Sequence, residues 1–147
     1  MQIFVRDFKP CDQRDAETLI NANLCEHFGL LKPELNPDLF DIAKSYLSGT
    51  FIVAVLDDDT LVGTGSLMPE NITVGRIARM HTSGKHRRLG IASRVLHSLE
   101  ERARSIGYVA LVLETNNDWY DAISFYQRHG YLEKYRNHIG IHFRKLL

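Results

Sequence analysis

Short hydrophobic runs, several of them alternating with polar residues, predict seven β-strands. Alternation with a period of two is typical of a strand with one buried face, and a short continuous apolar run is typical of a strand buried on both faces. The predicted strands are residues 3–8, 50–56, 60–68, 74–82, 108–113, a strand opened by Tyr131, and residues 138–147. The three aspartates at 57–59 supply the turn between the second and third strands.

Hydrophobic residues one helical turn apart predict the helices. The first helix follows Asp12, where four such residues begin: Ala16, Leu19, Ile20 and Leu24. The longest helix is predicted from hydrophobic residues spaced four apart, Ile91, Val95 and Leu99. It is expected to stop at Gly107, and a later helix over about residues 118–129 is expected to stop at Gly130. A short helix is predicted after Pro37.

This order of elements predicts an α/β fold. Along the chain it is β α (α) β β β α β α β β, which gives a mixed sheet with helices on both faces. A length of 147 residues suits a single domain, so one domain is expected over residues 1–147.

Composition changes this picture little. The chain is 44% hydrophobic and 24% charged, as is usual for a globular protein. Its longest apolar run, residues 51–56, is too short to cross a bilayer, and residues 1–10 lack the apolar core of a leader peptide. We therefore expect a cytoplasmic protein with no membrane partner, in which Cys11 and Cys25 are reduced, structural thiols.

Charge is balanced overall but unevenly distributed. Residues 1–70 hold 5 basic and 12 acidic residues, a net charge of −7, whereas residues 71–104 hold 8 and 2, a net charge of +6. A basic middle segment suits phosphates and an acidic first half suits a cationic partner, although both are also typical of solvated faces. Because there is no basic excess, nucleic acid is disfavoured as a partner.

Two short motifs of cofactor and metal sites are incomplete. Gly63-Thr64-Gly65 lacks the third glycine of a dinucleotide fingerprint, since Met68 stands in its place, so both glycines are interpreted as strand positions. His138 and His142 are four residues apart. On the predicted strand they would be about 13 Å apart, too far to bind one ion. No metal site is predicted.

Residues 87–92, with the sequence Arg-Arg-Leu-Gly-Ile-Ala, lead into the longest predicted helix and suit an anion. The first N–H groups of a helix lack partners and carry a partial positive charge. Gly90 and Ala92 are small enough to let a phosphate approach the backbone, and Arg87 and Arg88 can add charge-assisted hydrogen bonds. We interpret the segment as a pyrophosphate cradle, although an arginine pair before a helix can also be plain surface charge.

Two later segments stand in a specific order after this one. The first is Leu111-Val112-Leu113-Glu114, and the second is the ten-residue stretch 122–131, with the sequence Ala-Ile-Ser-Phe-Tyr-Gln-Arg-His-Gly-Tyr. Together with Arg-x-x-Gly-x-Ala at 87–92, they resemble the acyl-CoA-binding motif, the fifth strand and the A-I-x-F-Y-x-x-x-G-F/Y segment of the GCN5-related N-acetyltransferases, the GNAT superfamily. Leu61-Val62-Gly63 also looks like the third strand of that family, so the resemblance covers about residues 50–135.

The resemblance implies a GNAT-like fold, with a mixed, mostly antiparallel sheet splayed between the fourth and fifth strands and helices on both faces. It also implies acetyl-CoA (coenzyme A) as the cofactor, with the pantetheine arm in the gap between these strands. Backbone groups of Met80 and Thr82 would then meet the pantetheine and the thioester. The residues implied to hold the pyrophosphate are Arg87, Arg88, Gly90, Ile91, Ala92 and Ser93.

The activity implied is N-acetyl transfer, by direct attack of a primary amine on the thioester in a ternary complex. Tyr126 matches the family tyrosine that lies near the sulfur and acts as general acid. Glu114, twelve residues earlier, resembles in spacing the glutamate base of the ribosomal-protein N-terminal acetyltransferases. The alternative bases are a water relay and His81, although strand alternation turns His81 away from the face that Met80 and Thr82 share.

One position departs from the family pattern, because Trp119 stands where many members have asparagine. The nearby Asn117 is assigned the missing cofactor contact, and Trp119 is expected either to cover the cofactor or to line the acceptor pocket. That pocket is expected near residues 23–46 and 136–140. The acceptor would be a small-molecule or peptide amine, with the acidic first half favouring a cationic one.

Other functions fit parts of the sequence. An acyl-CoA-binding sensor without turnover would need the same cradle, and a generic α/β domain for a phosphorylated ligand would make the later motifs a coincidence. A monomer or a homodimer is expected.

Overall fold

The computed structural model describes residues 2–147, and its elements follow the predicted order. The strands are β1 (Ile3–Asp7), β2 (Thr50–Leu56), β3 (Leu61–Pro69), β4 (Val74–Thr82), β5 (Ala110–Thr115), β6 (Leu132–Arg136) and β7 (Ile141–Leu146). The helices are α1 (Gln13–Phe28), α2 (Ile42–Ser45), α3 (Ile91–Ile106) and α4 (Tyr120–Arg128). Short 3-10 turns fill much of the chain between α1 and α2, where prolines interrupt it.

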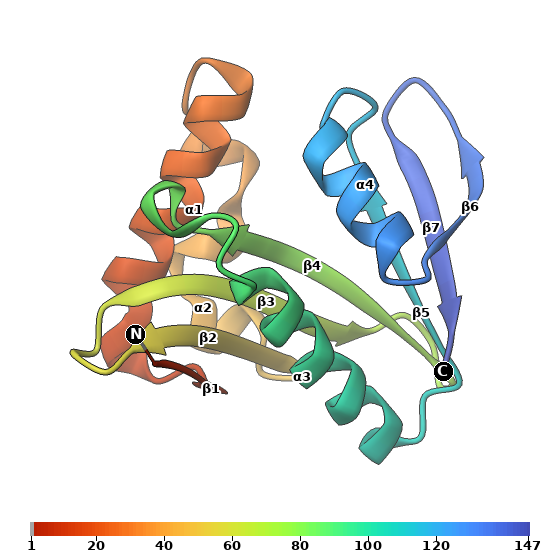
Figure 1. Cartoon of the computed structure of the whole chain (residues 1–147), viewed down its shortest axis with the longest axis horizontal. Helices are drawn as coiled ribbons and strands as arrows, with labels where there is room; N and C mark the ends of the chain where they lie inside the picture. Colours follow the sequence, from red (N-terminus) through yellow and green to blue (C-terminus); the bar gives the residue numbers. More distant parts are fainter. Residues whose placement is uncertain (1) are drawn as a thin grey trace.

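The strands form one seven-stranded sheet in the order β1-β2-β3-β4-β5-β7-β6 (Figure 1). Every neighbouring pair is antiparallel except β4 and β5, which run parallel. The predicted fold class, a mixed and mostly antiparallel sheet with helices on both faces, is confirmed.

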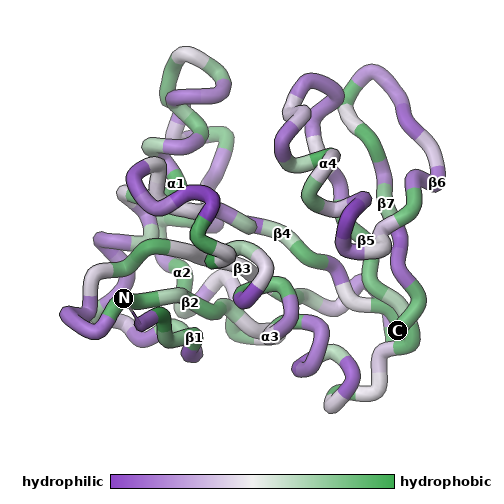
Figure 2. Tube along the Cα trace, viewed as in Figure 1, coloured by the Kyte–Doolittle hydropathy of each residue, from purple (hydrophilic) through white to green (hydrophobic). Residues whose placement is uncertain are grey.

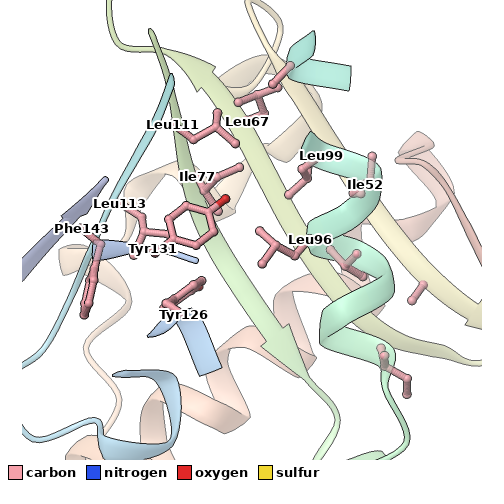
Figure 3. Packing of buried hydrophobic residues seen from close by; sticks show 14 of the residues in the cluster. Ile52, Leu67, Ile77, Leu96, Leu99, Leu111, Leu113, Tyr126, Tyr131 and Phe143 are labelled. Carbon is pink, nitrogen blue, oxygen red and sulfur yellow. The ribbon is translucent and has the colours of Figure 1, made fainter. Parts of the chain in front are cut away.

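Two hydrophobic clusters lie on opposite faces of this sheet. One lies between α3, α4 and the sheet, and it includes Leu96 and Leu99 from α3 (Figure 3). The other joins α1 and α2 to β2. Gly65 fits the first cluster because a Cβ atom there would come within 2.6 Å of Val95 Cγ1. The interpretation of this glycine as a strand position, where another element approaches closely, is therefore confirmed.

Two predicted boundaries were wrong because they depend on pairing between distant strands. β5 continues through Thr115, since Glu114 pairs with His142 of β7, so Glu114 lies inside the strand. The last strand begins only at Ile141. Before it, the side-chain oxygen of Asn137 accepts hydrogen bonds from the N–H groups of Ile139 and Gly140 and forms a turn. His138 therefore lies in that turn, and the strand spacing between it and His142 does not apply.

Two further expectations concern the role of the cysteines and the absence of a membrane-spanning segment. Cys11 and Cys25 are free and exposed, and neither belongs to a hydrophobic cluster, so their predicted structural role is wrong. Within residues 2–147, none of the helices has both the length and the apolar character needed to span a membrane.

Candidate functional site

β4 and β5 pair over only three residues each. Val74 to Arg76 pair with Ala110 to Val112, and beyond them the two strands diverge towards α1 and α4 (Figure 1). The rest of β4 therefore has no neighbouring strand on this side, and its outward N–H and C=O groups border the gap. The predicted splay between the fourth and fifth strands is confirmed.

The backbone of β4 is fixed beside this gap by a bulge at Arg79. The pairing register with β3 shifts here, and Arg79 adopts a left-handed conformation with φ of +54°. The Thr64 hydroxyl donates to the Arg79 carbonyl at 2.7 Å, and the Ser66 hydroxyl donates to the Ala78 carbonyl at 2.9 Å. Two hydroxyls of β3 thus hold the irregular part of β4 in place.

Alternation along β4 decides which backbone groups face the gap. The Ser83 N–H donates to the Val62 carbonyl of β3 at 2.8 Å, so the backbone groups of Thr82 and Met80 point away from β3. The Met80 side chain packs against the α3 cluster. The Thr82 carbonyl accepts a hydrogen bond from Asn23 at 3.0 Å. The Thr82 N–H and the backbone of Met80 therefore border the gap.

The start of α3 offers unpaired N–H groups. The first bond of the helix runs from Arg94 N–H to the Gly90 carbonyl at 3.1 Å, and no side chain caps this end. The N–H groups of Ile91, Ala92 and Ser93 therefore have no partner within the helix. Gly90 has φ of +78°, and a Cβ atom there would meet no heavy atom within 4 Å. The hydrophilic segment before α3 (Figure 2) thus ends in an open, N–H-lined cradle of the kind that fits a phosphate group.

The two arginines of the cradle differ. The Arg87 guanidinium donates to Glu26 at 2.7 Å and to Asn23 at 3.2 Å, so its side chain is engaged with α1. Arg88 and Lys85 form no ion pair with any residue from 2 to 147. The predicted charge-assisted contact from the Arg87 side chain is therefore corrected, because Glu26 binds that guanidinium, whereas the side chains of Arg88 and Lys85 are left without an ion pair among residues 2–147.

A hydrogen bond that the sequence analysis missed joins α3 to α4. Ser93 Oγ lies 3.0 Å from His129 Nε2, and His129 Nδ1 lies 2.8 Å from the Phe125 carbonyl oxygen. Because a carbonyl only accepts, Nδ1 carries a proton, and Nε2 shares the second hydrogen bond with the Ser93 hydroxyl. Neither the residue types nor their spacing in the sequence indicates this hydrogen bond between Ser93 and His129.

Tyr126 lies on the α4 side of the sheet. Its side chain is 8% exposed and packs near Tyr131, with the ring centroids 5.7 Å apart (Figure 3). Burial raises the pKa of the Tyr126 phenol, so the phenol keeps its proton at neutral pH. Its hydroxyl makes no hydrogen bond with any residue from 2 to 147. The group is therefore a protonated donor without an internal partner.

Glu114 lies on the opposite face of the sheet. Leu113 belongs to the α3 cluster, and alternation along β5 turns Glu114 to the other side. Glu114 Oε1 lies 3.7 Å from His142 Nε2 on the neighbouring strand. The structure thus separates the two predicted catalytic residues, Tyr126 and Glu114, by the thickness of the sheet, and it adds His142, which sequence reasoning missed.

His81 points towards α1, on the other face of β4 from the α3 cluster against which Met80 packs. Its Nδ1 atom lies 3.3 Å from the Asn23 side-chain nitrogen. Burial, with the charges of Arg79 and Arg87, lowers the pKa of His81 to about 4. The ring is therefore neutral at physiological pH, and it binds a proton weakly.

Trp119 and Asn117 each contact another part of the chain. The Trp119 ring stacks on His27 of α1, with centroids 3.9 Å apart, and Asp118 lies 3.2 Å from the same histidine. Trp119 therefore joins the start of α4 to the end of α1, on the face where the acceptor pocket was expected. The Asn117 amide donates to the Asn137 carbonyl at 2.9 Å, so it stabilises the β6–β7 connection.

A charged network ties the segment before α2 to the β4 bulge. The Arg79 guanidinium donates to both carboxylate oxygens of Asp38, at 2.6 and 3.0 Å, and Tyr46 donates to the same carboxylate at 2.5 Å. Burial alone would raise the pKa of Asp38, but the hydrogen bonds from Arg79 and Tyr46 lower it overall. The network holds one wall of the expected acceptor pocket against β4.

Acid should weaken this network. Because the native pKa of Asp38 lies below its unfolded value, the stabilisation is present above about pH 4 and is lost as the pH falls through the native pKa. Asp38→Asn should lower the free energy of unfolding by about 2 kcal/mol at neutral pH. It should also flatten the loss of stability between about pH 5 and pH 3 in urea titrations. An equally steep loss in the variant would assign the acid sensitivity to other carboxylates.

Comparison with known proteins agrees with the family resemblance of the sequence motifs. Residues 16–131 match the family model for the acetyltransferase (GNAT) family. N-acetyltransferase family 8 member 2 of Rattus norvegicus is 37% identical over 103 residues, which are 66% of this chain and 46% of that protein. The uncharacterized N-acetyltransferase YsnE of Bacillus subtilis (strain 168) is 35% identical over 106 residues, with 71% and 68% covered. The chain spans about half the length of the mammalian relatives that it matches.

Solved structures share the whole fold. A GNAT-family acetyltransferase of Staphylococcus aureus Mu50 superposes with a TM-score of 0.91 at 19% identity, with 99% of each chain covered. The PaiA N-acetyltransferase of Thermoplasma acidophilum, in complex with coenzyme A, gives a TM-score of 0.87 at 16% identity over the full length of both chains.

Proposed function

Because the chain belongs to the GNAT family of acetyltransferases, we propose that it is an N-acetyltransferase that transfers an acetyl group from acetyl-CoA to a primary amine in a ternary complex. The observation that carries this proposal is the open start of α3 with its three unpaired N–H groups, since Ile91 lies close to Gly63, the β3 partner of Thr82 at the splayed end of β4. The coenzyme A bound to the Thermoplasma acidophilum relative supports the same ligand class.

The chain's own groups suit coenzyme A. The N–H groups of Ile91, Ala92 and Ser93 would hold the pyrophosphate, with the Gly90 backbone leaving room and Arg88 adding charge. Arg87 would contribute through its backbone, since Glu26 occupies its side chain. Backbone groups of Met80 and Thr82 along the gap would meet the pantetheine arm. We no longer assign Asn117 a contact, because its amide serves the β6–β7 connection.

Acetyl transfer to an amine requires three catalytic contributions from the protein. Negative charge develops on the thioester oxygen, and backbone N–H groups at the β4 bulge, fixed by Thr64 and Ser66, are placed to stabilise it. The departing thiolate can take a proton from Tyr126, whose raised pKa keeps it protonated. The incoming amine must lose a proton, which requires a base on the acceptor side.

Glu114 suits that last role better than His81. A histidine with a pKa of about 4 takes up an ammonium proton poorly, and Asn23 already occupies its Nδ1 atom. Glu114 is partly exposed and faces away from Tyr126, so the acid and the base would approach the reacting centre from opposite faces. A water relay ending at Glu114 fits the same arrangement.

Glu114→Gln should lower kcat/KM about tenfold near neutral pH, because the amine then loses its proton without a positioned base. The defect should shrink as the pH rises towards the pKa of the acceptor amine, where neutral amine is abundant. Initial rates against pH for both proteins measure this. Glu101→Gln, which removes an exposed carboxylate of α3, is the matched control. A defect that stays constant across pH would assign Glu114 a structural role.

Thiol release from acetyl-CoA, measured across a panel of amines, tests the activity. Turnover that depends on the amine supports the proposal. Saturable binding of acetyl-CoA without turnover on any amine would identify a sensor instead, and binding of inorganic phosphate alone would identify a generic phosphate-binding domain.

A further inference from the structure

One part of the sheet lacks a helical cover. On the face that carries α1 and α2, the buried cluster of those helices involves β2, whereas the half of the sheet formed by β5, β7 and β6 contributes nothing to it. A cavity of about 310 Å³ opens where these strands meet the start of β4. Its walls include Arg76, Val112, Lys134, Tyr135, His142 and Arg144.

Strand register brings two arginines to either side of one valine. Arg76 of β4 pairs with Val112 of β5, and Val112 pairs with Arg144 of β7. The two arginine side chains therefore start from positions on either side of a short apolar side chain, and all three residues line the cavity.

Charge in this cavity is predominantly positive. Arg76 Nε donates to Glu70 at 2.7 Å, so the Glu70 carboxylate largely neutralises the charge of Arg76. Arg144 and Lys134 form no hydrogen bond or ion pair with any residue from 2 to 147 through their side chains. Three cations thus face one carboxylate, and two of the three are free to bind an anion.

One residue of the cavity wall, His142, lies next to the proposed base. Glu114 and His142 form the next like-facing pair along β5 and β7, two residues from Val112 and Arg144, which corresponds to about 7 Å. His142 lines the cavity, stacks on Tyr135 with centroids 4.1 Å apart, and lies 3.7 Å from Glu114. If an amine is bound at Glu114, a second group of the same molecule, several bonds from the nitrogen, can therefore reach the two free cations.

We infer that the acceptor is an amine that carries a carboxylate several bonds from its nitrogen, with the carboxylate bound by Arg144 and Lys134. This inference rests on the proposed acetyl transfer and on Glu114 as its base. It replaces the cationic acceptor that the acidic first half favoured. Two of the carboxylates beside the expected acceptor pocket are already neutralised, Asp38 by Arg79 and Glu26 by Arg87.

Acceptors of equal length test the inference. With acetyl-CoA, kcat/KM for ε-aminocaproate should exceed that for hexylamine by about tenfold, and hexamethylenediamine should be the poorest of the three. For a peptide source of the same chemistry, the amidated dipeptide Ala-Asp-NH2 is compared with Ala-Asn-NH2, which lacks a carboxylate. The carboxylate preference, in whichever source it occurs, should disappear in Arg144→Gln, so that the charged acceptor and its uncharged counterpart become equally good. Arg14→Gln, at an exposed arginine of α1, is the control.

The outcomes separate the inference from the proposed function. If no amine releases thiol, the proposed transfer fails. If amines are acetylated but neither carboxylate-bearing acceptor is preferred, or if the preference survives Arg144→Gln, this inference is overturned and the transfer stands.

Discussion

Replacing Ala92 with glutamate is expected to raise the Kd for acetyl-CoA by about 100-fold or more without destabilising the protein. Ala92 is the second residue of α3, where a carboxylate is favoured by the helix dipole by about 0.3–1 kcal/mol. The same carboxylate would stand among the N–H groups proposed to bind the pyrophosphate, and it would repel that group. Stability and ligand affinity should therefore change in opposite directions, which a general folding defect cannot produce.

Ala92→Gln is the matched control, because it adds nearly the same volume without the charge. Calorimetric titration with acetyl-CoA and urea unfolding of each variant measure both quantities. Glutamine should weaken binding less than glutamate does. Wild-type affinity in Ala92→Glu would show that the ligand does not use the start of α3.

Replacing Tyr126 with phenylalanine is expected to lower kcat by about 100-fold while leaving the Kd for acetyl-CoA and the free energy of unfolding nearly unchanged. The ring stays in its cluster, and the lost hydroxyl has no hydrogen-bond partner among residues 2–147 that would be left unsatisfied. The reaction should slow rather than stop, because a thiolate with a pKa near 8.5 is a tolerable leaving group.

Tyr120→Phe provides the control for that experiment, since Tyr120 lies on the same helix and is 72% exposed. Single-turnover rates with an amine that the wild-type protein accepts would measure the chemical step directly. An unchanged rate in Tyr126→Phe would remove Tyr126 from the reaction and leave the thiolate to depart unprotonated.

Local sequence signals predicted most of the fold. Strand alternation and helical spacing located every strand and the long helices, and Gly107 ends α3 in a left-handed conformation, with φ of +102°, as a stop signal should. The errors at Glu114 and His138 have one cause. The extent of β5 and β7 depends on their register with each other, and no short window of sequence contains both strands.

The site was predictable where it consists of backbone and small residues, and unpredictable where distant side chains pair. Gly90 and Ala92 mark the cradle within a single motif. The contact of Arg87 with Glu26 spans 61 residues and that of Arg79 with Asp38 spans 41, so composition reveals neither partner. Ion pairs of this kind are set by the packing of α1 and its following segment on the sheet, which only the folded chain defines.

The central claim is that the start of α3 binds the diphosphate of coenzyme A, and amide hydrogen exchange during an acetyl-CoA titration measures it most directly. Without ligand, the N–H groups of Ile91, Ala92 and Ser93 have no helical partner and should exchange rapidly. We predict saturable binding heat, together with slowed exchange at these positions. If titration with acetyl-CoA gives no binding heat and leaves the exchange of these three N–H groups unchanged, the claim that the start of α3 binds coenzyme A is contradicted.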